Sequence, residues 1–210
     1  REGISTLNAK DIRYAGQLGY TIKLMAIAKR ENDRIEVRVS PVLIPENAPL
    51  AKVDGVFNAV EIEGDLVGRV LFHGQGAGSK PTASAVLGDI FRICRYISSN
   101  LDVPGNLIPN NFLEIKKVDE LISRYYIRLT ALDEAGVLAQ MSRILGDLRI
   151  GIATVIQKES DVQSKTAEVV ITTYPALERD MRQAIKDISE LAVVKEIGNA
   201  LRIEDSEESQ

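Results

Sequence analysis

The second half of the chain changes its hydrophobic period in a fixed order, and this order constrains the fold more than any other feature of the sequence. From Ser123 onward a strand-like segment is followed by an amphipathic helix, two strands, a second helix and a closing strand. This is the order of the ferredoxin-like βαββαβ arrangement, in which one face of an antiparallel sheet carries both helices. We therefore predict such a domain over residues 123–204. The apolar stripes of its two helices consist of Val137, Leu138, Met141, Ile144, Leu145 and Leu148, and of Leu177, Met181, Ala184, Ile185, Ile188 and Leu191.

Residues 1–100 predict a separate domain of mixed α/β character. Residues 8–18 predict a short helix, with Gly19 at the position where helix ends favour glycine. Two strand pairs follow, with turns at residues 31–33 and 63–65. The predicted fold class is therefore α/β (α+β): a mixed β-sheet with helices, followed by the ferredoxin-like domain.

Three further segments complete the predicted organisation. Residues 82–97 predict an amphipathic helix, and Cys94 lies on its apolar stripe, which indicates a small core residue rather than a nucleophile. Residues 101–122 contain prolines and no sustained period, which is typical of a linker between domains. The acidic residues 205–210 predict a solvated tail.

Composition excludes several classes of partner. The net charge of -4 provides no basic surface for nucleic acid and no polybasic segment for a membrane. No apolar run is long enough to span a bilayer, and the first residues do not have the pattern of a signal peptide. Cys94 is the single cysteine, so an internal disulfide is impossible and a reducing, cytoplasmic location is expected. The chain begins with Arg1 rather than Met, which favours a fragment of a longer protein.

The glycine-rich segment 73–82 is the first candidate site. It lies between a predicted strand and a predicted helix, where backbone N–H groups attract anions. It departs from the dinucleotide fingerprint, which would need glycine or alanine where Ser79 stands, and Pro81 breaks the order of a P-loop. Spacing alone leaves a phosphate cradle and a plain tight turn both open. His73, the single histidine, has no second ligand nearby, so no metal site is expected.

The segment Asp133–Val137 is the second candidate site, between the first strand and first helix of the βαββαβ domain. Acidic residues favour a helix N-terminus and glycine eases the turn, which is a sufficient structural explanation. Free N–H groups beside Gly136 also suit the carboxylate of a small ligand. Both readings stay open on geometry alone. No catalytic acid, base and nucleophile assemble anywhere in the sequence, so no catalytic residue is assigned.

Most of residues 1–98 resembles bacterial homoserine dehydrogenase. The resemblance is carried by EGI at 2–4, YAGQLGYTIKLMAIAK at 14–29, PVLIP at 41–45, PLAKVDGVFNAVEIEGDLVG at 49–68 and GQGAGSKPTASAVLGDI at 74–90. It implies NAD(P)-dependent interconversion of L-homoserine and L-aspartate 4-semialdehyde, in threonine and methionine biosynthesis. It further implies a sheet that pairs subunits, a helix that packs on a nucleotide-binding domain, and backbone contacts to the cofactor from Gly76, Ala77 and Gly78. His73 departs from the tyrosine usual in the family, which leaves no assigned role for its ring.

Residues 124–203 resemble an ACT domain, a small regulatory module of amino-acid biosynthesis. The matching motif is LTALDEAGVLAQMSRILGDLRIGIATVIQK at 129–158. ACT domains commonly pair and bind an amino acid where the first loop of one meets the second strand of another. For this chain the resemblance implies threonine or a similar small amino acid as an allosteric effector. The implied contact residues are Asp133, Glu134, Ala135, Gly136, Val137, Ile150, Gly151, Ile152 and Ala153.

The resemblance also implies what the chain lacks. The nucleotide fingerprint and the catalytic lysines and acids of the family are expected before the EGI segment, outside these 210 residues. We therefore expect a homo-oligomeric fragment, a dimer or higher, that is inactive alone. NADP or NAD would serve the parent enzyme, without binding this chain tightly. The alternative hypotheses are a non-catalytic amino-acid sensor built from these two domains, and a purely structural dimerisation module.

Overall fold

The computed structural model describes residues 2–99, 113–157 and 163–204 and divides the chain into two compact units. The sheet unit consists of Arg1–Glu46 with Leu113–Gln210, and the hairpin unit consists of Asn47–Phe112. Each unit has its own secondary structure.

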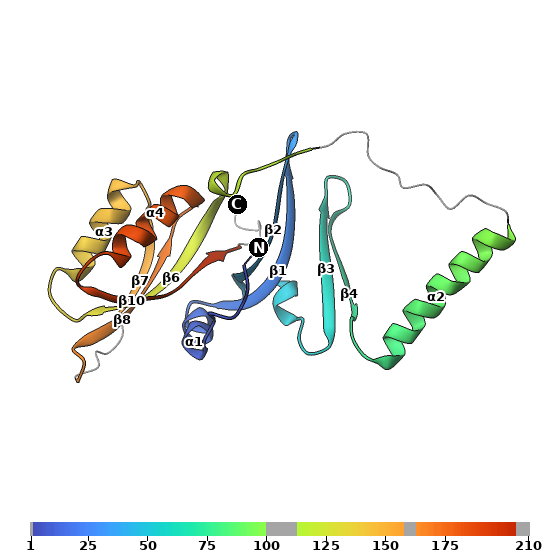
Figure 1. The fold of residues 1–210 in the computed structure, drawn as a ribbon, viewed down its shortest axis with the longest axis horizontal. Coiled ribbons are helices and arrows are strands. Elements are labelled where there is room, and N and C mark those ends of the chain that lie inside the picture. The colour runs from blue at the N-terminus through green and yellow to red at the C-terminus, as the bar shows by residue number, and fades with distance from the viewer. Residues whose placement is uncertain (1, 100–112, 158–162, 205–210) are drawn as a thin grey trace. The chain divides into compact units, whose positions relative to one another are not determined.

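The described part of the sheet unit is built on an eight-stranded mixed sheet (Figure 1). Its main path runs in the order β1-β2-β10-β6-β8-β7, with β5 beside β2 and β9 beside β6. Neighbouring strands on the main path are antiparallel except β2 and β10, which pair in parallel at Arg202↔Val42 and Ile203↔Leu43. The strands are β1 (Tyr20–Glu31), β2 (Arg34–Pro45), β5 (Glu114–Ile115), β6 (Ile122–Leu132), β7 (Ile152–Gln157), β8 (Thr166–Thr173), β9 (Ala176–Leu177) and β10 (Val194–Ile203).

The predicted βαββαβ order is confirmed. Helix α3 (Val137–Asp147) follows β6, helix α4 (Glu178–Ser189) precedes β10, and the four main strands lie in the order β10-β6-β8-β7. Both helices pack on one face of these strands and close a core with the inward side chains of β6 and β8 (Figure 1). The largest fully buried members of this core are Ile127, Leu129, Met141, Leu145, Ile171, Met181 and Ile188.

The opposite face of the same strands is covered as well. Helix α1 (Ala9–Gln17) contributes Tyr14 and Ala15 to a second core, where they meet Tyr126 and Val170. Successive side chains of a strand point to opposite faces, so Tyr126 faces α1 while its neighbours on β6 face α3 and α4. The predicted helix over 8–18 is confirmed: Asn8 caps its start, and Gly19 follows its end with a φ of 80°, a left-handed conformation that favours glycine.

The hairpin unit has little core of its own. It contains the short 3₁₀ helix η1 (Pro49–Lys52), the antiparallel pair β3 (Phe57–Gly64) and β4 (Gly68–Gln75), and helix α2 (Ser79–Ser98). The predicted hairpin and helix are thus present, but no described side chain of α2 is buried within the structure. The prediction that Cys94 is a core residue is wrong, because its side chain is exposed.

The structure divides the chain differently from the predicted boundaries. Residues 1–46 do not form a domain with the rest of 1–100, because β2 pairs with β10 and so joins the βαββαβ sheet. The predicted linker is structured over residues 113–122, which form β5, the 3₁₀ helix η2 (Val118–Glu120) and the start of β6. The rest of that linker and the predicted tail at 205–210 lie outside the described residues. None of the described helices is long and apolar enough to cross a membrane.

Candidate functional site

The loop between β6 and α3 borders a cavity of about 190 Å³. Four of the five residues predicted for this loop line it: Glu134, Ala135, Gly136 and Val137. Gly136 has a φ of 90°, and no atom lies within 4 Å of where a Cβ would stand. The glycine is therefore required by the backbone conformation, and the space above it is open to a ligand. The remaining lining residues are Leu132, Leu138, Gln157 and Val169.

The start of α3 gives this cavity an electrostatic preference. Gly136 occupies the N-cap position, and no side chain caps the helix there. The first hydrogen bond of the helix runs from the N–H of Gln140 to the carbonyl of Gly136 at 3.1 Å. The N–H of Val137 donates to the carbonyl of Glu134 at 3.4 Å, and the next N–H groups of the first turn lack partners inside the helix and carry the positive end of its dipole. The cavity therefore suits a carboxylate.

Asp133 does not line this cavity. Its carboxylate accepts a hydrogen bond of 2.9 Å from Nε2 of Gln157 at the end of β7, and its N–H donates to the carbonyl of Lys165 at 3.0 Å. Its charge is thus held toward β7. Gln157 was not among the predicted site residues, although it lies at the end of the strand that closes the matching motif.

The other predicted effector residues lie elsewhere. Ile150 is buried, and its N–H donates to the carbonyl of Leu145 at 2.8 Å. A Cβ on Gly151 would stand 3.0 Å from the ring of Tyr174, and Ile152 and Ala153 belong to β7. None of residues 150–153 lines the cavity at α3. The chain therefore does not bring the two predicted halves of the effector site together within itself, and their meeting across two subunits stays a prediction.

The glycine-rich loop connects β4 to α2, as predicted. Gly76, Ala77 and Gly78 are all exposed. A Cβ at Gly76 would fall 1.5 Å from Nδ2 of Asn58, and Gly78 has a φ of 115°. Glycine is therefore favoured at both positions by the fold itself. The contact of this loop with a cofactor stays a prediction.

His73 lies on β4 and is exposed. Its ring stacks on that of Phe57 with centroids 4.9 Å apart. Among the described residues no group of three or more histidine, cysteine, aspartate or glutamate side chains is arranged to hold a metal ion. The ring contact with Phe57 is the interaction that the structure gives this histidine.

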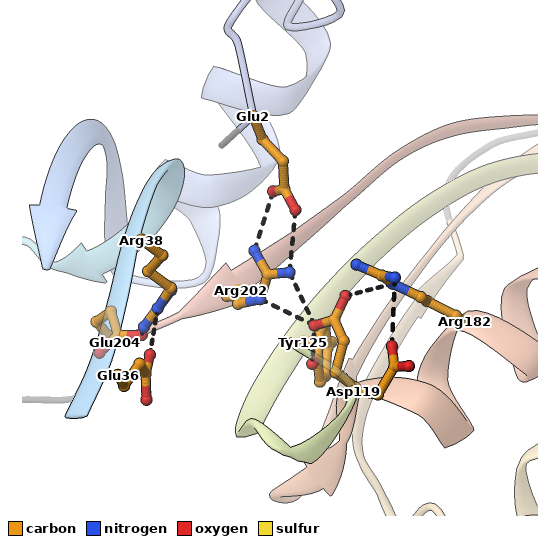
Figure 2. A network of polar contacts seen from close by, with 9 residues as sticks. Glu2, Glu36, Arg38, Asp119, Tyr125, Arg182, Arg202 and Glu204 are labelled. Carbon is orange, nitrogen blue, oxygen red and sulfur yellow. Dashed lines mark hydrogen bonds and ion pairs between the residues drawn. The ribbon is translucent and has the colours of Figure 1, made fainter. Parts of the chain in front are cut away.

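The sequence did not predict a buried polar cluster around Glu178, of which Figure 2 labels Glu2, Tyr125, Arg182 and Arg202. The Glu178 carboxylate accepts hydrogen bonds from the hydroxyl of Tyr125 at 2.6 Å, from Nε and Nη2 of Arg202 at 3.0 and 2.8 Å, and from Nε of Arg182 at 2.9 Å. Arg202 also donates to both oxygens of Glu2, at 2.9 and 3.0 Å. Burial opposes ionisation of Glu178, but the hydrogen bonds from Tyr125 and the Arg202 charge outweigh it and lower the pKa of Glu178.

A second buried cluster fastens α1 to the sheet. Asp11 is fully buried and accepts from Nε and Nη2 of Arg128 at 2.6 and 3.3 Å, from Asn199 at 2.6 Å and from Tyr126 at 3.4 Å. The acids of both clusters are surrounded by donors, so the clusters hold structural elements together and offer no free general base. A charged residue within the apolar run of β6, Arg128, was a sequence signal for the Asp11 cluster.

Comparisons with known proteins agree on one family. A protein-family model described as homoserine dehydrogenase matches residues 1–91. Homoserine dehydrogenases of Neisseria gonorrhoeae and Helicobacter pylori are each 40% identical to the chain over 97% of its length, which is 48% and 47% of theirs. A solved homoserine dehydrogenase from Thiobacillus denitrificans is 39% identical, with a TM-score of 0.83 over 97% of this chain and 47% of the other. The chain spans about half the length of the curated relatives it matches.

Proposed function

Because the chain belongs to the homoserine dehydrogenase family, we propose that it forms the subunit-pairing and regulatory half of such an enzyme. The whole enzyme interconverts L-homoserine and L-aspartate 4-semialdehyde by hydride transfer to a nicotinamide cofactor. The observation that carries this proposal is the 40% identity over 97% of the chain. It is supported by the strand, glycine loop and helix at β4–α2, which stand where the resemblance requires them.

In this proposal the glycine loop touches the cofactor through its backbone. The exposed segment Gly76–Gly78 precedes the N-terminus of α2, and a cofactor can approach closely at Gly78, which has no Cβ; at Gly76 the corresponding space is taken by Asn58. The chain spans about half the length of the homoserine dehydrogenases that it matches. The hydride chemistry, NAD or NADP, and the acid–base groups are therefore assigned to the other half of the enzyme.

A chimeric enzyme tests this assignment. The half of the Neisseria gonorrhoeae enzyme that aligns with the chain is replaced by the chain, and homoserine-dependent reduction of NAD and NADP is followed by absorbance. We expect activity in the chimera and background rates from the chain alone. An inactive chimera that is folded and binds cofactor would contradict the proposal. So would turnover by the chain alone.

The second part of the proposal is regulation by a small amino acid. The cavity at α3 takes the carboxylate of threonine or a similar amino acid on the N–H groups of the first helical turn, beside Gly136. The ammonium and hydroxyl face Gln157 and residues 150–153 of a second subunit. Support comes from the open space above Gly136 and from the engagement of Asp133 with Gln157, which turns one repelling charge aside.

Calorimetric titration with threonine tests the effector site. Alanine at Gly136 places a methyl group in the cavity at the expense of backbone strain, since its φ is 90°. Gly19→Ala is the matched control, with a φ of 80° and equally open surroundings in the same unit. We expect Gly136→Ala to lose threonine binding and Gly19→Ala to keep it. Equal binding by both variants would remove the loop from the site.

Subunit pairing is the third part of the proposal. Within the described residues β3 and β4 form a two-stranded sheet, and both of its outer edges are unpaired. Its side chains Val60, Ile62 and Phe72 are exposed. A two-stranded hairpin is marginally stable by itself, and a bare edge invites another strand. Pairing with a second copy would satisfy both requirements in a closed, symmetric contact.

A further inference from the structure

A second cavity, of about 210 Å³, lies in the sheet unit, and we call it the Arg38 cavity. It is lined by β2 together with residues near η2, on α4 and on β10, and it shares no residue with the cavity at α3. Its volume is below the roughly 300–1,000 Å³ of pockets that enclose drug-sized ligands. A molecule of a few carbon atoms is the size that fits.

Two buried hydrogen-bond donors in the lining have no partner among the described residues. The hydroxyl of Ser40 is one, with Ser40 1% exposed. Nη1 of Arg38 is the other, and the Arg38 side chain is 8% exposed. The remaining donors of Arg38 are engaged, Nε with Glu36 at 2.5 Å and Nη2 with Glu204. A buried donor without a partner reduces the stability of the fold, so a bound acceptor at these two groups would be favourable.

The charges around the cavity limit what that acceptor is. Glu2 and Glu36 line the cavity, and Glu204, which is not in the lining, forms an ion pair with Arg38. Arg202 donates to Glu2 and Glu178, and Figure 2 shows its contact with Glu2. The lining residue Arg182 is paired with Glu178 and Asp119, and the lining residue Lys116 is paired with Glu31. Each cation of the lining is thus already paired with an acid among the described residues, and a doubly charged phosphate would also meet Glu2 and Glu36. A single carboxylate can accept from two donors, and Arg38 and Ser40, two positions apart on the same face of β2, each have one donor without a partner.

We propose that the Arg38 cavity binds the carboxylate of a small monocarboxylic metabolite through Nη1 of Arg38 and the hydroxyl of Ser40. A plain carboxylic acid and an amino acid share this chemistry. They differ at the other end of the molecule, where an ammonium group would meet Glu2 or Glu36. The site is independent of the effector cavity at α3, since the two have no residue in common.

Titration of the ¹⁵N-labelled 210-residue chain, followed by NMR, tests this site with acetate, glycine and inorganic phosphate as probes. We expect saturable shifts of the Ser40 amide and the Arg38 side-chain signals with acetate or glycine, and none with phosphate at equal ionic strength. Glycine binding more tightly than acetate assigns the site to amino acids, and the reverse order assigns it to plain acids. Absence of saturable shifts with both carboxylates overturns the proposal, as does tighter binding of phosphate.

Ser40→Ala is the decisive variant, because it removes the hydroxyl and leaves the ion pairs of Arg38 in place. Loss of a hydrogen bond to a charged group should weaken carboxylate binding by roughly ten- to a hundredfold. Ser123→Ala, on β6 in the same unit and away from the cavity, should bind as the unchanged chain does. Arg38→Lys keeps the charge but loses the free Nη1, and it should also weaken binding. Unchanged affinity in both Ser40→Ala and Arg38→Lys would refute the assignment.

Discussion

Replacing Asp11 by asparagine should destabilise the whole sheet unit. Asp11 is fully buried and accepts five hydrogen bonds, from the backbone of Asn8, from Tyr126, twice from Arg128, and from Asn199. Asparagine keeps the shape but removes the charge, and its amide group would point N–H donors at donors. The Arg128 side chain, 5% exposed, would then hold a buried charge without its main partner.

The size of the effect follows from these contacts. Breaking a buried ion pair by removing one partner costs about 3–5 kcal/mol, much of it because the remaining charge is left buried and uncompensated. Glu168 lies 3.8 Å from Nη1 of Arg128 and compensates a part, which places the expected loss near the lower end, about 3 kcal/mol. This is a large share of the roughly 5–15 kcal/mol by which domains are stable.

Urea unfolding followed by far-ultraviolet circular dichroism measures this loss, since the chain has no tryptophan to serve as a fluorescent probe. Asp147→Asn, at the exposed end of α3, is the control and should change stability by less than about 0.5 kcal/mol. A loss in Asp11→Asn no greater than in the control would refute the buried α1 interface. A transition confined to α1, with the βαββαβ strands unaffected, would refute the division of the chain into the two units described above.

Three further predictions concern stability and assembly. The pKa of Glu178 is lowered in the folded chain, so the stability that its carboxylate contributes is present above the ordinary glutamate pKa of about 4.3 and is lost as the pH falls through the folded value. The urea midpoint should therefore fall between pH 7 and pH 3, and it should fall less steeply in Glu178→Gln. Gly198→Ala would place a Cβ 2.5 Å from Cζ of Arg128, so it should lower the free energy of unfolding by about 1–3 kcal/mol. The loss should be smaller in an Asp11→Asn background, where Arg128 is free to move. Sedimentation at micromolar concentration should give a species larger than the 23.1 kDa monomer, and a monomer alone would contradict subunit pairing.

The elements that were predicted correctly are those set by local patterns. The stripes of α3 and α4 and the turn at 31–33 depend on residues a few positions apart, so periodicity and turn chemistry identify them. The turn predicted at 63–65 lies at residues 65–67 in the structure, so this hairpin was found with its turn displaced. The junction of β2 with β10 depends on two register pairs between segments some 160 residues apart in the sequence. No local signal encodes such a pairing. The boundary between the two units was therefore misplaced, although nearly every element was found.

The candidate sites also divide into those with a local sequence signature and those formed only by the tertiary fold. The loop before α3 was identified because a glycine followed by an apolar helix is a local signature, and the structure places a cavity there. Arg38, Ser40 and Glu178 carried no such signature. They are scattered along the chain and are brought into buried positions by the tertiary fold. Charged residues and serine are mostly exposed, so a sequence pattern favours an exposed position for each of these three.

Strand β6 contains an unbroken run of buried residues, which local patterns alone did not explain. Its residues Tyr125–Leu129 are all buried, without the alternation expected of a sheet with one wet face. Such a strand must be covered on both sides, by α3 and α4 on one and by α1 on the other. Because a shift of one residue would exchange the two sets of side chains, both cores fix the same register. Cutting the βαββαβ fold away from residues 1–46 would therefore uncover Tyr126, Val170 and Leu201 and strip Arg128 of Asp11, so the predicted regulatory fold depends on helix α1.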